Sequence, residues 1–443
     1  MIPVHLPAYI TRNKTGLIAL LLFFVVWKTF VSCLGNTFSN YDDAQYVYDN
    51  PHVISGLTLA NVRWAFTSST VGNWHPLTSL SHILDSQFFG GWAPGHHFVS
   101  IVFHCLNSML VFLLFERMTG ALWKSFWAAL LFGIHPLRVE SVAWVAERKD
   151  VLSTFFFLLT AFAYARYAAE SKRGGTRSRQ YFRLAVLCLF LGLMCKPMLV
   201  TVPCVLLLLD IWPLARWTPE TAWSLLREKA AFFILAGVFS VTALFTQHAG
   251  MLPLTYMPLS VRVENVPVAY CRYVGKLIYP VNLACLYPYP IHWPAVLVIG
   301  CTLVFLIASA AVAFIGRRRA YVLVGFLWFV GTLFPVIGLM QAGSQSLADR
   351  YSYIPSLGLV VMAVWGVSDL AERCKFSPAG LWALGLGLAV TCMALTRRQI
   401  SFWKDPESQW RHAAAVTVAF LAFSVNFSHA VFGGTGKRRR VVE

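Results

Sequence analysis

The sequence has little charge. Only 12% of its 443 residues are Asp, Glu, Lys or Arg, and just 19 of them are acidic. Instead, 58% of the residues are hydrophobic and 15% are aromatic, where a soluble domain is about 45–50% apolar. Apolar runs of about 20 residues recur along the chain, each long enough to cross a bilayer core of about 30 Å. The composition therefore excludes an ordinary soluble protein and predicts an all-α polytopic membrane protein, and the continuous apolar runs exclude a β-barrel.

The sequence also lacks metal-binding signatures. Its ten cysteines are scattered, mostly within apolar segments, with no CxxC pair among them, so they are interpreted as buried small hydrophobic residues. Histidines gather between residues 73 and 97, and His82 and Asp85 share one helix face. A metal would require three or four ligands with a supporting second shell, and no HExxH motif is present. We therefore expect no metal or other cofactor, and histidines that form hydrogen bonds in a packed loop helix.

The apolar runs predict about 11 membrane-spanning helices. No Pro-, Gly- or Ser-rich linker and no repeat of 20–50 residues divides the chain, so we predict one membrane domain over 1–412. A long loop, 35–96, follows the first span. The predicted spans are 15–34, 97–115, 121–135, 151–169, 182–195, 198–214, 230–248, 295–315, 321–340, 353–371 and 378–396.

The formal net charge of +17 is explained mainly by topology rather than by nucleic acid. The densest basic runs, at 170–183, 227–229, 316–320 and 372–375, fall on one side of the predicted spans, as cytoplasmic loops do. The other polar segments then converge on the opposite face. Charged residues at a membrane edge that do not anchor topology usually mark a functional site. Segment 260–293 is ambiguous, and an amphipathic helix in the interface fits it better than a span.

An acidic pair lies just beyond the first span. Asp42 and Asp43 stand in "FSNYDDAQYVYDNP", where one carboxylate could accept a proton from an acceptor hydroxyl while the other orients the nucleophile. A solvated turn at the helix end is the alternative.

Basic residues follow on the same predicted face. "HPLRVESVAWVAERKD" (135–150) concentrates both signs of charge, and its cations could hold a phosphate. Glu140 and Glu147 lie seven residues apart, two helical turns on one face, and could hold the cations by ion pairing. A helix hairpin stapled by salt bridges is the alternative, although exposed pairs contribute only about 0–1 kcal/mol. Lys196 could meet a lipid phosphate or simply snorkel, and Arg350 could bind phosphate or belong to a helix cap with Asp349.

Five motifs in order resemble the transmembrane and tetratricopeptide-repeat O-mannosyltransferases, which are glycosyltransferases of the GT-C superfamily. They are "YDDAQYVYDNPHV", "NWHPLTSLSHILD", "HPLRVESVAWVAERKDVLS", "LGLMCKPMLVTVPCVLLLLDIWPL" and "ADRYSYIPSLG". The resemblance covers about 38–412 and implies a GT-C-like bundle. It implies transfer of mannose from a polyprenyl-phosphate carrier to Ser or Thr of an acceptor protein, outside the cytoplasm.

The resemblance also assigns residues. It maps Asp42 and Asp43 to the expected catalytic pair, and places Glu147, Arg148, Lys149, Lys196 and Arg350 in family motifs. Their roles in donor binding are inferred from charge rather than from the resemblance, and the set expected to bind the donor phosphate is Arg138, Arg148, Lys149, Lys196 and Arg350. The set expected to support it is His75, His135, Glu140, Glu147 and Asp349.

The C-terminal region departs from the family pattern. "FWKDPESQWRHAAAVT" resembles the junction where relatives begin their repeat array, but 413–443 shows no helix-pair repeat and could add a twelfth span. We predict a multi-pass protein of a bacterial inner membrane, with its site facing the periplasm or exterior. A transporter or flippase of lipid-linked glycan would want ionisable groups near mid-membrane and inverted repeats. Such a transporter or flippase and an inactive truncated remnant are the alternatives to a glycosyltransferase.

Overall fold

The computed structural model describes residues 8–247, 257–290, 292–340, 343 and 345–417, and this part of the chain is mainly helical. One short antiparallel pair is present, in which β1 (Tyr287–Pro288) pairs with β2 (Gln345–Leu347). The α-helices are α1 Ala8–Phe30, α2 Pro51–Ile54, α3 Leu59–Thr67, α4 Pro76–Phe89, α5 Ala93–Thr119, α6 Leu122–Ile134, α7 Val139–Ala143, α8 Arg148–Lys172, α9 Ser178–Leu193, α10 Val202–Ile211, α11 Ala222–Glu228, α12 Ala230–Gln247, α13 Leu259–Ile278, α14 Ala295–Gly316, α15 Ala320–Leu333, α16 Pro355–Arg373, α17 Pro378–Ser401 and α18 Pro406–Val416.

Each predicted span overlaps a helix, but not every helix is long enough to cross a membrane. Among the described residues, seven segments have the length and hydropathy of a span: 13–35, 93–119, 145–172, 230–247, 295–316, 355–373 and 378–401. The apolar helices over 122–134, 197–211 and 320–336 are shorter, and α9 has only 16 residues. The chain is thus a multi-pass membrane protein by its apolar helices, while the count of eleven remains a prediction. The expected twelfth helix lies outside the described residues.

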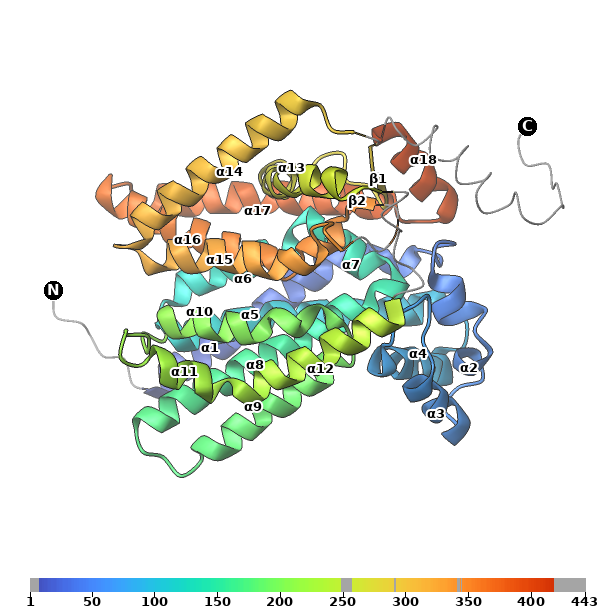
Figure 1. The fold of residues 1–443 in the computed structure, drawn as a ribbon, viewed down its shortest axis with the longest axis horizontal. Helices are drawn as coiled ribbons and strands as arrows, with labels where there is room; N and C mark the ends of the chain where they lie inside the picture. The colour runs from blue at the N-terminus through green and yellow to red at the C-terminus, as the bar shows by residue number, and fades with distance from the viewer. Residues whose placement is uncertain (1–7, 248–256, 291, 341–342, 344, 418–443) are drawn as a thin grey trace.

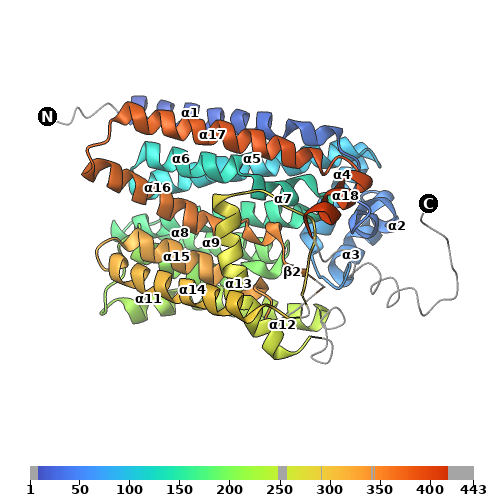
Figure 2. The ribbon, with the colours of Figure 1, turned by 90° about the horizontal axis from the view of Figure 1, so that it is seen from above.

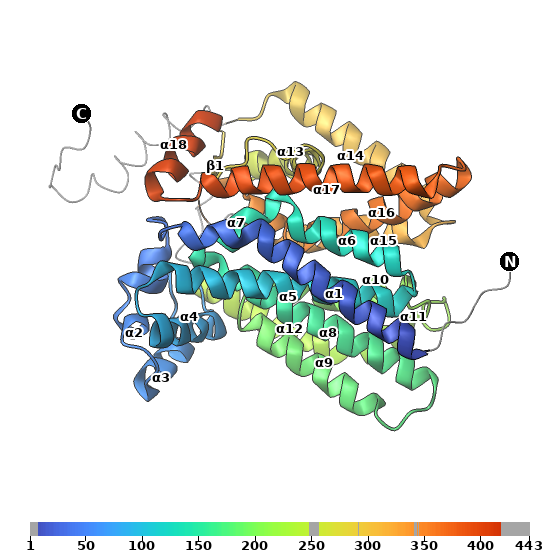
Figure 3. The same ribbon diagram turned by 180° about the vertical axis from the view of Figure 1, so that it is seen from behind.

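The long helices run side by side and give the bundle two distinct ends (Figure 1). The connections α8–α9, α11–α12, α14–α15 and α16–α17, which hold the four basic segments, lie at one end. The short elements α2, α3, α4, α7, β1, β2 and α18 lie at the other, as the view from behind also shows (Figure 3). The predicted segregation of basic loops from the polar motifs is therefore present in the fold.

Helix α13 runs across the bundle. It is seen nearly end-on in Figure 1 and, after a quarter turn, runs crosswise to the direction of α14 and α17 in Figure 2. Its sequence is amphipathic and it includes Pro267, and it is not among the segments with the composition of a span. This orientation is the one expected of a helix that lies along a membrane surface.

The buried apolar side chains of the described residues form one large core. A second, small cluster is formed by Val53, Ala65 and Ile83, which come from α2, α3 and α4. Helices α15 and α16 approach closely through Gly325 and Gly358. A Cβ built on Gly325 would come within 2.5 Å of the Gly358 carbonyl oxygen. Small residues at such crossings allow two backbones to meet within a membrane. Because α16 begins just after Arg350, this contact helps to fix one wall of the site.

Candidate functional site

A cavity of about 500 Å³ lies at the end of the bundle that holds the polar motifs. One side is built by Lys196 and the 3₁₀ turn Pro197–Thr201 together with the C-terminal half of α12, and another by residues within 335–340 and 345–351. The loop that carries Asp42 and the turn before α4 complete the wall. The cavity therefore gathers side chains that are far apart in the sequence.

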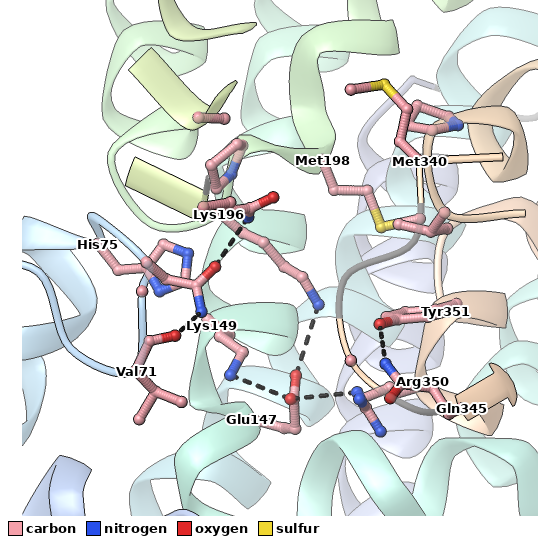
Figure 4. Close-up of a pocket in the computed structure, with 18 of the residues that line it drawn as sticks. Val71, His75, Glu147, Lys149, Lys196, Met198, Met340, Gln345, Arg350 and Tyr351 are labelled. Carbon is pink, nitrogen blue, oxygen red and sulfur yellow. Dashed lines mark hydrogen bonds and ion pairs between the residues drawn. The ribbon is translucent and has the colours of Figure 1, made fainter. Parts of the chain in front are cut away.

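Glu147 is the centre of the charged part of the cavity, and three cations converge on it (Figure 4). Its Oε1 lies 3.0 Å from Nζ of Lys149 and 3.2 Å from Nε of Arg350. Its Oε2 lies 3.4 Å from Nζ of Lys196. All four side chains line the cavity, although each residue is at most 9% exposed. Charges held this far from water need partners on every side, and Glu147 fixes the three cations as one group.

Two further carboxylates, Asp150 and Glu140, pair with two of the three cations. Asp150 pairs with Lys196 and accepts a hydrogen bond from Ser141 Oγ at 3.0 Å. Glu140 Oε1 lies 2.5 Å from Nη1 of Arg350, and its Oε2 accepts the Arg350 backbone N–H at 2.7 Å. The two glutamates were expected on one face of a single helix. That expectation is wrong, because the helix breaks at Trp144 between α7 and the 3₁₀ turn Val145–Glu147, yet both glutamates still reach Arg350.

The two members of the acidic pair face different surroundings. Asp42 lines the cavity, and its pKa is raised by burial and by the charge of Glu147, against the opposing charges of Lys149 and Arg350. Asp43 is 1% exposed and is not part of the cavity wall. Its Oδ1 accepts the Ala146 N–H and its Oδ2 accepts the Ser39 N–H, each at 2.7 Å, while burial raises its pKa to about 7. Asp42 can thus meet a substrate, whereas Asp43 fastens its loop.

Two of the expected phosphate-binding residues do not line the cavity. Arg148 is fully buried and donates to Asp85 Oδ2 at 2.7 Å, to Ser100 Oγ at 2.7 Å and to the His96 carbonyl at 2.5 Å. Arg138 donates to the Tyr353 carbonyl at 2.8 Å and to Ser356 Oγ at 2.6 Å. The prediction that they bind a phosphate is not supported by this geometry, because their donors are directed into the packed interior.

The remaining predicted residues divide between the cavity and its support. His75 lines the cavity, and burial together with Lys149 and Lys196 holds its pKa well below the ordinary range. His135 does not reach the cavity wall. Its Nδ1 accepts the Leu137 N–H at 3.2 Å, and its Nε2 lies 2.9 Å from the Leu277 carbonyl. Asp349 accepts a hydrogen bond from Tyr287 Oη at 2.8 Å, behind Arg350.

Several cavity residues were missed from the sequence. Tyr351 and Gln345 line the cavity and are joined by a 3.0 Å hydrogen bond, and Gln247 at the end of α12 lies 2.8 Å from Asn73 Oδ1. Tyr351 directly follows Arg350, which was a usable signal. Nothing in the sequence around Gln247 indicated that the end of an apolar helix would reach a loop 174 residues away.

The histidine cluster has the spacing of a metal site, but its carboxylate pairs with an arginine. Ligand atoms of His82, Asp85 and His96 lie within 4.8 Å of one another, and all three residues are buried. Asp85 Oδ2 binds the Arg148 guanidinium at 2.7 Å. A cation placed there would meet that positive charge at close range. The chemistry of this donor set therefore suits an arginine-centred cluster better than a metal.

Comparison with known proteins reveals relatives along most of the chain. Protein O-mannosyl-transferase TMTC4 of Homo sapiens is 24% identical over 459 residues, covering 88% of this chain and 61% of its own length. The Mus musculus protein of that name is 24% identical over 487 residues, covering 94% of this chain and 63% of its own length. Protein O-mannosyl-transferase Tmtc2 of Drosophila melanogaster is 30% identical over 179 residues, 39% of this chain. The chain thus spans a little over three fifths of the first two relatives.

Other comparisons add little. The solved structure of ArnT from Cupriavidus metallidurans bound to undecaprenyl phosphate matches 96% of this chain and 73% of its own, with a TM-score of 0.41 and 15% identity. Both values are too low to carry an inference about fold or ligand. No protein-family model matches the chain. The sequence relatives agree with the resemblance seen in the five motifs, and the protein O-mannosyl-transferases are homologues of this chain.

Proposed function

We propose that this protein is a membrane glycosyltransferase that moves a sugar, mannose by analogy with its homologues, from a polyprenyl-phosphate carrier to a Ser or Thr hydroxyl of an acceptor protein. The observation that carries the proposal is a single cavity in which a carboxylate, Asp42, lies beside a fixed group of three cations. A base for the acceptor and positive charge for the leaving phosphate are the two requirements of this transfer.

The cavity also suits a lipid-linked donor because its walls differ in polarity. Besides the charged group, apolar side chains of Met198, Leu244, Val336 and Met340 line the wall. Leu244 is 44% exposed and lies on α12, a span-length helix whose outer face also exposes Val241 and Phe245. The apolar wall is therefore continuous with a surface that fits a bilayer. A molecule with a phosphate head and a hydrocarbon tail would match both parts of this cavity.

In the proposed reaction, Asp42 accepts the proton of the acceptor hydroxyl as its oxygen attacks the anomeric carbon. The bond from that carbon to the phosphate oxygen breaks, and its electron pair leaves with the lipid phosphate. Lys149, Lys196 and Arg350 would stabilise the phosphate, with Glu147 holding them in place before the substrate arrives. The proposal requires no metal, since these side chains supply the positive charge, and it directs the site away from the cytoplasm because the basic loops lie at the other end.

The decisive test is transfer of radiolabelled mannose from polyprenyl-phosphate-mannose to protein, in membranes that contain the chain or its Asp42→Asn variant. We expect at least about a 100-fold lower rate in the variant, because the amide cannot accept the proton. Asp49→Asn is the matched control, since Asp49 lies on the same loop but is exposed. We expect it to retain the native rate.

The outcomes separate the alternatives. Transfer that is equal in the native chain and in Asp42→Asn would remove Asp42 from the mechanism. Labelling no higher than in membranes without the chain would contradict the proposed activity with this donor. Movement of the intact lipid across reconstituted vesicles without glycosyl transfer would instead identify a flippase.

A further inference from the structure

Helix α18 packs directly against the loop that carries the acidic pair. Gln409 is buried on this helix, and its Oε1 accepts a hydrogen bond from Ser39 Oγ at 2.8 Å. The next residue, Trp410, donates from Nε1 to Asn40 Oδ1 at 2.8 Å. Its ring meets Tyr41 edge-on at a centroid distance of 5.5 Å. Three consecutive loop residues, immediately before Asp42, are thus held by two consecutive helix residues.

The helix is itself firmly attached to the bundle. Asp405 caps its first turn by accepting the Ser408 N–H at 2.8 Å. Just before the helix, the Lys404 carbonyl accepts the N–H of Thr37, which belongs to the same loop, at 2.9 Å. On its other side, His412 Nε2 lies 3.0 Å from the Leu283 carbonyl. Because the contact of His412 with Leu283 does not involve the loop, α18 can act as a support for the loop.

The opposite side of the loop is held by the segment that leads to Glu147. Asp43 binds the Ala146 N–H, and the Tyr41 ring stacks on Trp144 at 5.1 Å with an angle of 22° between the planes. Asp42 lies between Tyr41 and Asp43, so both of its neighbours are fixed. The contacts of Asp43 with Ala146 and of Tyr41 with Trp144 remain in any variant of α18. The contacts of Ser39 with Gln409 and of Asn40 with Trp410 depend on that helix.

We infer that Gln409 and Trp410 are positioning residues, which hold the loop so that Asp42 faces the cavity. Neither residue is among those that line the cavity, and both contact the loop through Ser39, Asn40 and Tyr41. This inference rests on the proposed role of Asp42. It adds that α18, the extramembrane helix after α17, is part of the support of the site. A displacement of α18 would therefore move Asp42 through the side chains of Gln409 and Trp410.

The test compares Gln409→Ala, Trp410→Ala and Trp410→Phe with Arg411→Ala as the control. Arg411 lies on the same helix, but its side chain is 78% exposed and pairs with Glu407, one turn away on the helix. We expect the two alanine variants to lower kcat about tenfold or more, with an unchanged KM for the lipid donor, because misplaced catalytic groups are costly while the cations are untouched. Trp410→Phe keeps the ring against Tyr41 and should recover part of the rate, and Arg411→Ala should match the native chain.

Hydrogen exchange supplies a readout that does not need activity. Amides of 37–46 should exchange faster in Trp410→Ala than in the native chain and in Arg411→Ala, while peptides from α5 and α8 should not change. Faster exchange with a lower kcat supports the inference. Native kcat in both alanine variants, or a rise in KM without a fall in kcat, would overturn it. If Asp42→Asn is inactive while those variants are native-like, only this inference fails; if Asp42→Asn is active, the proposed base itself is wrong.

Discussion

Asp42 is the side chain whose protonation should control activity with pH. An ordinary aspartate has a pKa of about 3.9. Burial and the nearby Glu147 raise the pKa of Asp42, and Lys149 and Arg350 act against that rise. A base must be deprotonated to act, so activity is lost as pH falls through the raised pKa.

We therefore expect the acid limb of kcat/KM to lie above about pH 4. Lys149→Gln removes an opposing positive charge and should move that limb upward by about 1 pH unit or more. The measurement is the pH profile of mannose transfer. Lys172→Gln, an exposed residue at the far end of the same helix, is the control and should leave the limb in place. An acid limb that does not move in Lys149→Gln would contradict this account of Asp42.

Arg148 and Lys149 show how one residue step changes a role. Both begin α8, where adjacent residues point about 100° apart around the axis. That rotation directs Lys149 into the cavity and Arg148 toward Asp85. The sequence indicated that this connection bears charge, but it could not place the helix boundary at Arg148, so it could not tell which cation faces which way.

At the scale of elements, the close crossing of α15 and α16 should be the most sensitive helix contact. Gly358→Ala would place a methyl group against the Gly325 backbone and the Trp328 side chain, so the helices must separate. Overpacking of this kind costs about 1–3 kcal/mol. We expect a lower melting temperature for the detergent-solubilised variant, and a lower transfer rate because Arg350 precedes α16.

Gly366 supplies the comparison, because it lies two turns further along α16 and a Cβ there would meet no atom within 4 Å. Gly366→Ala should leave the melting temperature unchanged or raise it slightly, since alanine favours a helix by about 1 kcal/mol over glycine. Equal melting temperatures for the Gly358→Ala and Gly366→Ala variants would show that the crossing is looser than the structure indicates.

Helix α13 shows where composition was informative at this scale. Its charged residues, among them Arg262, Glu264 and Lys276, made a span unfavourable, and the helix does run across the bundle. The sequence did not indicate what α13 contacts. Arg262 Nη1 lies 3.3 Å from the Leu339 carbonyl, and Tyr273 donates to the Ala348 carbonyl at 3.0 Å, so the helix supports the segment that leads to Arg350.

At the scale of the whole molecule, the two ends of the bundle should lie on opposite sides of the membrane. Cys374 is exposed in the basic α16–α17 connection, and Asp49 is exposed at the site end. In cells, a membrane-impermeant maleimide should label Cys374 only after permeabilisation. Asp49→Cys, in a chain with Cys374→Ser, should be labelled without it. Labelling of both positions in intact cells would contradict the arrangement.

The amino-acid sequence alone was enough to predict the class of protein, the approximate helix ranges and the segregation of charge between the two ends. These follow from hydropathy and loop charge, which are local properties that a bilayer reads directly. It also indicated six residues that line the cavity: Asp42, His75, Glu147, Lys149, Lys196 and Arg350.

The folded structure was needed to show which charged side chains share the cavity and which make internal contacts. Asp43, Arg138, Arg148 and His135 are of the same residue types as the side chains that line the cavity. Their hydrogen bonds and ion pairs, however, are made with distant segments packed against them in the interior. The support of the acidic loop by α18 joins residues 370 positions apart. Such contacts depend on how helices pack and on where each turn begins, and a hydropathy pattern contains neither.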